Sequence, residues 1–510
     1  MKLEIGNWKF GLAHDLKLKN CRNSFLLIVL IFIVSSIPKN VCCQNLVPNL
    51  DLSSHWDGHT HIGVPPYNSL WGWTDTDGRE YAILGSLDSI YFFDVTNPYK
   101  IRLCDARAGG AYKGSVVSSR NREFKTYKNY CYAVADAAYA GLQVYDLKYL
   151  PDSVHKVYDD ITLSSNAHSL YIDGTRLYLS WNKRMQNGDN DIPVTVLSLK
   201  NPEIPTFISD LVAPVQDLGG GKTLSEFEYV HDLFVRNDTA YCCCGYDGMF
   251  IYDYKDSIHP HLLQTIANYI DAGYNHSCWL STDGNLLVFT DETQYARVKL
   301  YDVSALKASG QRHLNEVCLF SSHATEGSIG HNAYMKGKLI YMSYYEDGVV
   351  VFDMSDSTNV HEVASYDTYP QNQPGQYHGT IGCWNIYPFF PSGTIIASDM
   401  ENGLFVLRLD SVSAINSNYI ACNTLNIKII QNPFKENINL VANTSTSQKV
   451  EISLYDMIGK KFFSSDYDCF PGSTLINIPC PSRISGTIIL TAKAGNCTLT
   501  RKLIQMEAGN

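Results

Sequence analysis

The sequence predicts an all-β protein, and three observations lead to this expectation. The 510 residues are 45% apolar and 12% aromatic and include 34 tyrosines, a composition that suits pleated, half-buried surfaces. Short alternating apolar runs end at Gly, Asp and Asn turns. One short phrase also recurs along most of the chain. Since the length exceeds that of a usual single domain, more than one domain is expected.

The first 43 residues predict a secretory signal peptide. A basic stretch leads into the apolar run 25–34, which is shorter than a membrane-spanning helix requires. Val41 and Cys43 have the spacing of a cleavage site, so Gln44 is the expected mature N-terminus. An uncleaved anchor is the alternative. No second long apolar run follows, so we expect no transmembrane span in the mature protein.

The recurring phrase reads Gly-apolar-x-apolar-aromatic-Asp-apolar, and seven copies can be counted. The copies are SIYFFDV at 89–95, GLQVYDL at 141–147, PVTVLSL at 193–199, GMFIYDY at 248–254, RVKLYDV at 297–303, GVVVFDM at 348–354 and GLFVLRL at 403–409. An alternating hairpin precedes each copy, and one more strand follows most of them. Four strands in about fifty residues are typical of one propeller blade.

The repeat therefore predicts a seven-bladed β-propeller over residues 44–412. The seventh unit lacks its fourth strand, whereas the run NLVPNLDLSS at 45–54 precedes the first unit without a partner. We expect this N-terminal run to complete the last blade and close the ring. The Asp that recurs in five copies of the phrase stands before a turn, so an Asx-type turn is its expected role.

A candidate site lies where the first strand of each blade begins. In a propeller these strands line the central channel, so equivalent residues should form a ring around one mouth. The ring positions predicted from the spacing are Trp71, Arg122, His168, His231, His276, His331 and His378. The turns between second and third strands should lie at the same face, and they are acidic, with Asp136, Asp247, Asp291, Glu292, Glu346, Asp347, Asp399 and Glu401.

Imidazoles beside carboxylates suit two kinds of chemistry. They can bind a divalent transition metal ion or perform acid-base catalysis. The candidate metal ligands are His231, His276, His331, Asp291 and Glu346. The alternative is structural: the ring histidines plug the channel mouth and bond main-chain groups or water.

Several other classes of function are disfavoured. The predicted signal segment carries six basic and two acidic residues, so the net charge moves from −11 to about −15 on its removal, which makes nucleic acid an unsuitable partner. The consecutive Cys242, Cys243 and Cys244 alternate along a strand and cannot converge on one ion. No phosphate-binding loop, nucleophile elbow or zinc-protease helix motif is found in the sequence.

The body resembles a known family. The blade phrases, with NSLWGWTDTDGREYAILGS at 68–86 and REFKTYKNYCYAVADA at 122–137, are similar to the LVIVD-repeat propellers of the choice-of-anchor B family. The resemblance covers about residues 45–410. It implies an exported propeller whose C-terminal device decides its anchoring, and a molecular activity that is generally unassigned.

The tail resembles a second family. The opening Asn432-Pro433-Phe434, the run EISLYDMIGKKFF at 451–463 and the later SGTIILTAKAG are similar to the type A sorting domain of the type IX secretion system. This implies a small β-sandwich at 425–510, joined by a linker at 413–424. It also implies recognition by the type IX machinery, removal of the tail, and attachment to surface lipopolysaccharide or release.

Two functional hypotheses remain. The first is a secreted or cell-surface binding module for a glycan, a protein or a small molecule, because repeat scaffolds often bind without chemistry. The second is a metal-dependent hydrolase or lyase that uses the ring of histidines and carboxylates. The first is favoured, because no asymmetric catalytic set is visible in the sequence.

Overall fold

A computed structural model describes most of the chain. It covers residues 50–59, 65–109, 121–136, 139–188, 190–219, 222–307, 314–322, 327–371, 379–409, 425–429, 437–455, 460–479, 486–495 and 497–505. The predicted signal peptide at 1–43 and the predicted linker at 413–424 lie outside these ranges. The chain divides into two compact units, Met1–Asp410 and Ser411–Asn510. Within the described ranges, no helix has both the length and the apolar character needed to cross a membrane.

The described part of the first unit contains seven four-stranded antiparallel sheets. In chain order of their first strands, the sheets are β2 (Tyr67–Thr74), β3 (Glu80–Ser86), β4 (Ser89–Asp94) and β5 (Arg102–Ala108); β6 (Arg122–Tyr127), β7 (Tyr130–Ala135), β8 (Leu142–Asp146) and β9 (His155–Asp160); β10 (Ser169–Asp173), β11 (Arg176–Asn182), β12 (Ile192–Ser198) and β13 (Thr206–Asp210); β16 (Asp232–Arg236), β17 (Thr239–Cys243), β18 (Met249–Asp253) and β19 (His261–Ile266); β20 (Asn275–Leu280), β21 (Leu286–Asp291), β22 (Val298–Asp302) and β23 (Asn315–Phe320); β24 (Gly330–Lys336), β25 (Leu339–Tyr344), β26 (Gly348–Asp353) and β27 (His361–Tyr366); and β28 (Cys383–Tyr387), β29 (Thr394–Asp399), β30 (Gly403–Leu409) and β1 (Leu50–Trp56).

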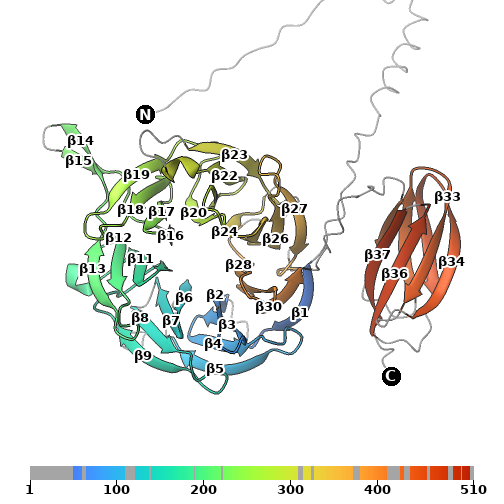
Figure 1. The fold of residues 1–510 in the computed structure, drawn as a ribbon, viewed down its shortest axis with the longest axis horizontal. Coiled ribbons are helices and arrows are strands. Elements are labelled where there is room, and N and C mark those ends of the chain that lie inside the picture. Colours follow the sequence, from blue (N-terminus) through green and yellow to red (C-terminus); the bar gives the residue numbers. More distant parts are fainter. Residues whose placement is uncertain are drawn as a thin grey trace, which may run out of the picture. The chain divides into compact units, whose positions relative to one another are not determined.

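The sheets are arranged around a central axis, with their first strands inside and their last strands outside (Figure 1). This radial arrangement of four-stranded antiparallel sheets is the β-propeller architecture. The repeated phrase lies on the third strand of each sheet, and most residues of these strands are buried, as are all five residues of β8. A strand covered by neighbouring sheets on both faces needs apolar residues at successive positions, which explains why this phrase dominates the sequence.

The ring closes through the N-terminal strand. β1 pairs antiparallel with β30, so that Leu50 stands opposite Leu409 and Trp56 opposite Leu404. The sequence prediction that the segment before the first unit completes the last sheet is therefore confirmed.

The recurrent aspartate makes the predicted turn in all five copies that carry it. Each carboxylate accepts a hydrogen bond from the backbone N–H two residues later, at 2.6 to 3.0 Å. The five residues are Asp94, Asp146, Asp253, Asp302 and Asp353. Their role is to start the turn after the third strand.

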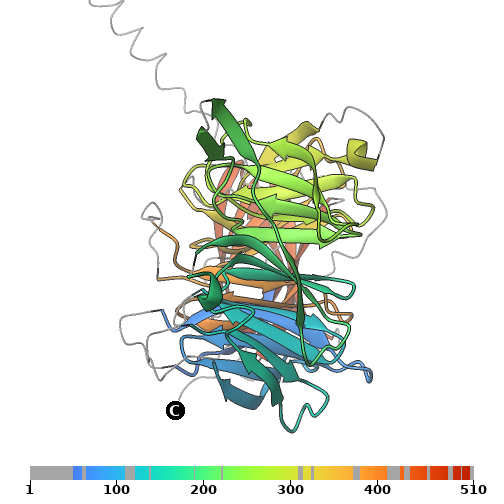
Figure 2. The same cartoon turned by 90° about the vertical axis from the view of Figure 1, so that its left-hand side faces the viewer.

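A few elements depart from the repeat. The hairpin of β14 (Val215–Gly219) and β15 (Lys222–Ser225) stands out from the ring in both views (Figures 1 and 2). Two short 3-10 helices follow β11 and β22, η2 (Met185–Asn187) and η3 (Ser304–Lys307).

The second unit is a small two-sheet structure. One sheet has the order β31 (Leu425–Ile429), β32 (Asn437–Thr444), β35 (Gly472–Pro479). The other has the order β34 (Lys461–Cys469), β33 (Gln448–Tyr455), β36 (Gly486–Ala494), β37 (Cys497–Gln505). Buried residues of both sheets, such as Ile438 and Ile452, share one core, as expected for a sandwich.

Candidate functional site

The first strands of the seven sheets share a four-residue pattern. A ring residue is followed by a polar residue, a buried residue and then an aromatic residue or lysine, as in His331-Asn332-Ala333-Tyr334. The ring residues in chain order are Asn68, Arg122, His168, His231, His276, His331 and Trp384. Five of these were predicted from the sequence.

One of the other two predicted positions requires correction, and the other falls outside the described residues. Trp71 lies three residues further along β2, where it packs against Tyr387 with ring centroids 5.0 Å apart, and Asn68 takes the ring position. β28 begins at Cys383, so its ring residue is Trp384; His378 lies outside the described residues. The physical reason for the error in β2 is that seven successive residues of this strand are buried, so the sequence pattern does not mark which of them begins at the mouth.

Four imidazoles form a continuous arc around the axis. The ring centroids of His168 and His231 are 4.0 Å apart, those of His231 and His276 are 4.4 Å apart, and those of His276 and His331 are 4.3 Å apart. Trp384 follows His331 at 5.0 Å. We call His168, His231, His276 and His331 the histidine arc. We call the end of the inner strands at which the arc lies the mouth.

Turns between second and third strands bring polar groups to the mouth. Nδ1 of His168 lies 3.1 Å from Oδ2 of Asp136, in the turn after β7. Nε2 of His276 lies 3.9 Å from Oε2 of Glu292, which directly follows β21. The hydroxyl of Tyr345, in the turn after β25, donates to Oε1 of Glu292 at 2.6 Å. Tyr345 is a site residue that sequence reasoning missed, because only the neighbouring acidic residues of its turn were considered.

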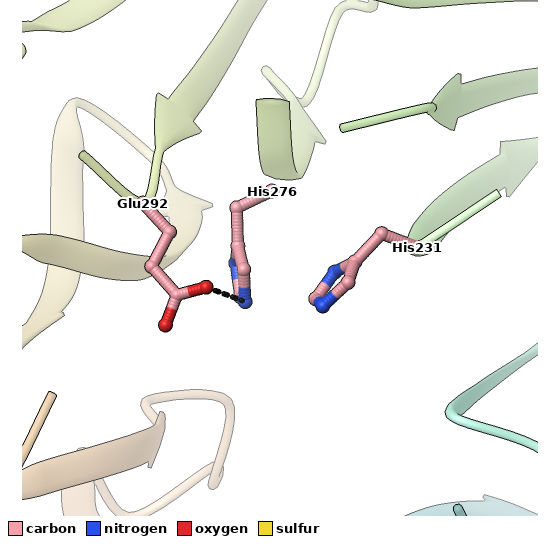
Figure 3. A group of neighbouring side chains, drawn as sticks. All are labelled: His231, His276 and Glu292. Carbon is pink, nitrogen blue, oxygen red and sulfur yellow. Dashed lines mark ion pairs between the residues drawn. The ribbon is translucent and has the colours of Figure 1, made fainter. Parts of the chain in front are cut away.

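Three possible metal ligands converge in this region. One ligand atom from each of His231, His276 and Glu292 lies within 4.8 Å of the other two. The two imidazoles and the carboxylate extend to the same side (Figure 3). Both histidine side chains are buried, and that of Glu292 is 20% exposed.

The predicted ligand set differs from this group. Asp291 instead bonds Nζ of Lys299 at 2.5 Å, with both side chains fully buried. Because Asp291 and Glu292 are consecutive, their side chains diverge, and Glu292 occupies the place expected for Asp291. His331 and Glu346 are buried but do not belong to the group of three within the described residues.

The histidines of the arc differ in protonation. Burial lowers the pKa of His231 and His276 well below the ordinary value, and it lowers the pKa of His331 to about 3. Burial also acts on His168, but its hydrogen bond to Asp136 and the charges of nearby carboxylates together outweigh burial, and the pKa is raised. Burial raises the pKa of Glu292. The mouth therefore combines three neutral imidazoles with one imidazole that holds its proton more firmly.

Hydrogen bonding fixes the tautomer of one of these rings. Nδ1 of His331 lies 2.5 Å from the carbonyl oxygen of Trp384, which can only accept, so Nδ1 carries the proton and Nε2 keeps its lone pair. In His231 and His276 the backbone of the next ring residue opposes the lowering of the pKa by burial but does not cancel it. Yet Nδ1 of His231 and Nδ1 of His276 have no bond of good geometry among the described residues.

Arg122 does not take part in the arc. Its side chain is 1% exposed, and Nε donates to the carbonyl oxygen of Ser86 at 2.9 Å. The guanidinium thus ties the second sheet to the turn after β3. Burial lowers its pKa.

Behind the mouth, the next residue of each inner strand contributes to a polar layer. Ser69 donates to Glu123 at 2.9 Å and accepts from Asn385 at 2.9 Å, and Ser169 donates to Asp232 at 2.6 Å. A cavity of about 20 Å³ next to this layer has room for about one water molecule.

The tail matches a family model. Residues 428–506 match the secretion system C-terminal sorting domain. This domain directs a chain to the type IX secretion machinery, so the protein is secreted or displayed on the cell surface. The prediction that the tail contains a type IX sorting domain is confirmed, whereas removal of the tail, attachment to lipopolysaccharide and the resemblance of the body to choice-of-anchor B proteins stay predictions.

Solved structures resemble the chain only distantly. A putative 6-phosphogluconolactonase from Bacteroides uniformis is 13% identical, with a TM-score of 0.45, over 81% of this chain and 100% of that one. A periplasmic gluconolactonase from Pseudomonas aeruginosa is 12% identical, with a TM-score of 0.45, over 81% and 99%. The WD40 repeats of RRP9 are 12% identical, with a TM-score of 0.45, over 71% and 99%. A search of curated proteins finds no match. At this distance the activities of these proteins say nothing about the activity of this one.

Proposed function

We propose that the protein is a binding module: a seven-bladed propeller of the LVIVD type, spanning residues 44–412, that holds a ligand at its mouth on the cell surface or after release. A signal peptide at 1–43 and the sorting domain at 425–510, joined by the linker 413–424, deliver it. Attachment to lipopolysaccharide is one possible end point of this export.

The observation that carries the proposal is the histidine arc. Four imidazoles at centroid distances of 4.0 to 4.4 Å concentrate polar, hydrogen-bonding atoms at one end of the axis. Such groups are expected to be satisfied when they are buried, yet two Nδ1 atoms of the arc lack good protein partners. A structural plug would be expected to satisfy its own nitrogens, so the arc fits a ligand site better.

Exposed aromatic residues around the mouth support the same proposal. Tyr139 and Tyr295 each stand three residues after a mouth carboxylate and are 41% and 68% exposed. Tyr246 is 79% exposed and contacts Tyr274, which in turn packs edge-on against His231. We call Tyr139, Tyr246 and Tyr295 the rim tyrosines. Exposed tyrosine supplies large contact area at a small entropic cost and is enriched at recognition surfaces.

The ligand class follows from this composition. Aromatic rings, imidazoles and carboxylates suit a neutral or cationic polar ligand such as a glycan or a protein segment, and the acidic chain does not suit nucleic acid. The second candidate, a metal-dependent hydrolase or lyase, is kept only because of the grouping of His231, His276 and Glu292.

An array experiment tests the proposal. The purified full chain would be applied to immobilised bacterial and plant polysaccharides and to surface-protein peptides. A variant with Tyr246→Ala and Tyr295→Ala should lose the binding, while Ile258→Ala, an exposed apolar side chain in the turn after the third strand β18, should keep it. Retained binding in the tyrosine variant would place the ligand away from the mouth.

A further inference from the structure

The grouping of His231, His276 and Glu292 has the donor set of a metal centre. Imidazole nitrogen and carboxylate oxygen are the ligands that Zn²⁺ and neighbouring first-row ions use. His231 directly precedes β16, His276 lies within β20, and Glu292 directly follows β21. One ligand atom from each residue lies within 4.8 Å of the other two.

The distances are close to those that an ion requires. Two ligands of a tetrahedral Zn²⁺ ion lie about 3.3 Å apart, as its bond lengths of about 2.0 to 2.1 Å dictate. Nε2 of His276 and Oε2 of Glu292 are 3.9 Å apart, so a small rotation of either side chain brings them to bonding separation. The carboxylate, at 20% exposure, is the side chain with more freedom to make that rotation.

The surroundings orient the carboxylate. Tyr345 donates to Oε1 of Glu292 at 2.6 Å, which turns Oε2 toward His276. A hydrogen bond to the second oxygen of a ligating carboxylate is the usual supporting contact of a protein metal site. Tyr345 itself is buried and packs against His331 at 4.5 Å, so its hydroxyl is held in place.

The flanking histidines lie outside the group of three that converges among the described residues. Nδ1 of His168 bonds Asp136, and Nδ1 of His331 bonds the carbonyl oxygen of Trp384. Three protein ligands leave at least one coordination position open, which is the arrangement of sites that meet an exogenous ligand.

We propose that His231, His276 and Glu292 bind one divalent first-row transition metal ion, with Zn²⁺ as the best match to the donors. This rests on the proposed function, because the ion lies in the same mouth and offers its open position to the ligand held there. Tyr345 is a positioning residue for Glu292.

Metal analysis of the full chain tests the inference. The protein is stripped with a chelator, loaded with Zn²⁺ or Co²⁺, separated from free ion and analysed for bound metal, with Co²⁺ absorption as a second reading. Wild type should hold metal in stoichiometric amount. His276→Ala and Glu292→Gln should each weaken binding at least about tenfold, since each removes a ligand. His259→Ala is the matched control, because it removes an exposed imidazole beside Asp256 away from the mouth.

Circular dichroism and thermal unfolding show whether each variant is folded. If His276→Ala fails to fold, the result for Glu292→Gln decides whether the metal site exists. This variant should fold, because the side chain of Glu292 is partly exposed and glutamine has nearly the same shape as glutamate. The inference is overturned if wild type holds no stoichiometric metal, or if Glu292→Gln holds as much as wild type.

The same preparations separate this inference from the proposed function. If the protein takes up no metal but still binds an array ligand, and this binding depends on the rim tyrosines, the binding module is supported and the metal site is overturned. Stoichiometric metal without any array ligand would sustain the metal site and remove the support for the binding module.

Discussion

His331 and Trp384 join two neighbouring sheets at the mouth: Nδ1 of the imidazole donates to the tryptophan carbonyl oxygen across 2.5 Å. Burial lowers the pKa of this histidine to about 3, so the ring stays neutral in the folded protein at neutral pH. The unfolded chain takes up the proton at its ordinary pKa of about 6.5.

This contact predicts a pH dependence of stability. Because the folded pKa lies below the unfolded one, the contribution is complete above pH 6.5 and is lost as the pH falls toward 3. The loss is about 1.4 kcal/mol per pH unit, or about 2 kcal/mol between pH 6.5 and 5. His331→Asn keeps a donor for the carbonyl but does not titrate. Urea unfolding of metal-free protein measures the free energy of unfolding at pH 7 and at pH 5. The decrease between these two pH values should be smaller in the variant than in wild type by about this amount, and equal decreases would contradict the account.

Asp136 should hold the proton of His168. Burial lowers the pKa of this histidine, but its hydrogen bond to Asp136 and the charges of Asp136, Glu123 and Asp232 together outweigh burial, and the pKa is raised overall. Asp136→Asn removes the two largest of these raising effects, so the pKa of His168 should fall. Magnetic resonance titration of chains with labelled histidine measures this directly. Asp256→Asn, beside the exposed His259, is the control that should leave His168 unchanged.

The buried pair of Lys299 and Asp291 should be needed for stability. Both side chains are fully buried, and the carboxylate also accepts from the hydroxyl of Tyr269 at 2.8 Å. Lys299→Met leaves the carboxylate buried without its counter-charge and should cost about 3 to 5 kcal/mol in the free energy of unfolding. Adding Asp291→Asn removes the charge but keeps an acceptor, so the double variant should be more stable than the single one. A double variant that is less stable than Lys299→Met would refute this explanation.

The closing strand offers a matched pair of substitutions. Leu50 of β1 is 2% exposed, whereas Leu52 of the same strand is 43% exposed. Leu50→Ala should cost about 2 to 5 kcal/mol, because it leaves a cavity where the two ends of the ring meet. Leu52→Ala should change the free energy of unfolding by less than about 1 kcal/mol. Chemical unfolding of both variants measures the difference, and equal effects would mean that β1 does not secure the ring.

Much of the fold could be predicted because it repeats. The same apolar phrase recurs wherever a strand is covered on both faces, and the aspartate at its end makes the same turn bond in five sheets. Closure of the ring by the N-terminal strand could be predicted because the seventh unit lacks a fourth strand and the run at 45–54 stands outside any unit. These features depend on periodicity and local chemistry, which the sequence displays directly.

The site could be predicted only in part, because it depends on which way individual side chains point. Asp291 and Glu292 are consecutive, yet Asp291 bonds a buried lysine and Glu292 faces His276. Seven successive residues of β2 are buried, so nothing in its pattern distinguishes Asn68 from the expected Trp71 as the ring position.

The most direct test of the account is the affinity for the strongest array ligand, measured by titration calorimetry with the full chain. His231→Gln changes the centre of the histidine arc, and His259→Gln makes the same change at an exposed site away from the mouth. We predict that His231→Gln binds at least about tenfold more weakly while His259→Gln binds like wild type. Equal affinity of wild type and a folded His231→Gln would contradict the claim that the mouth is the binding site.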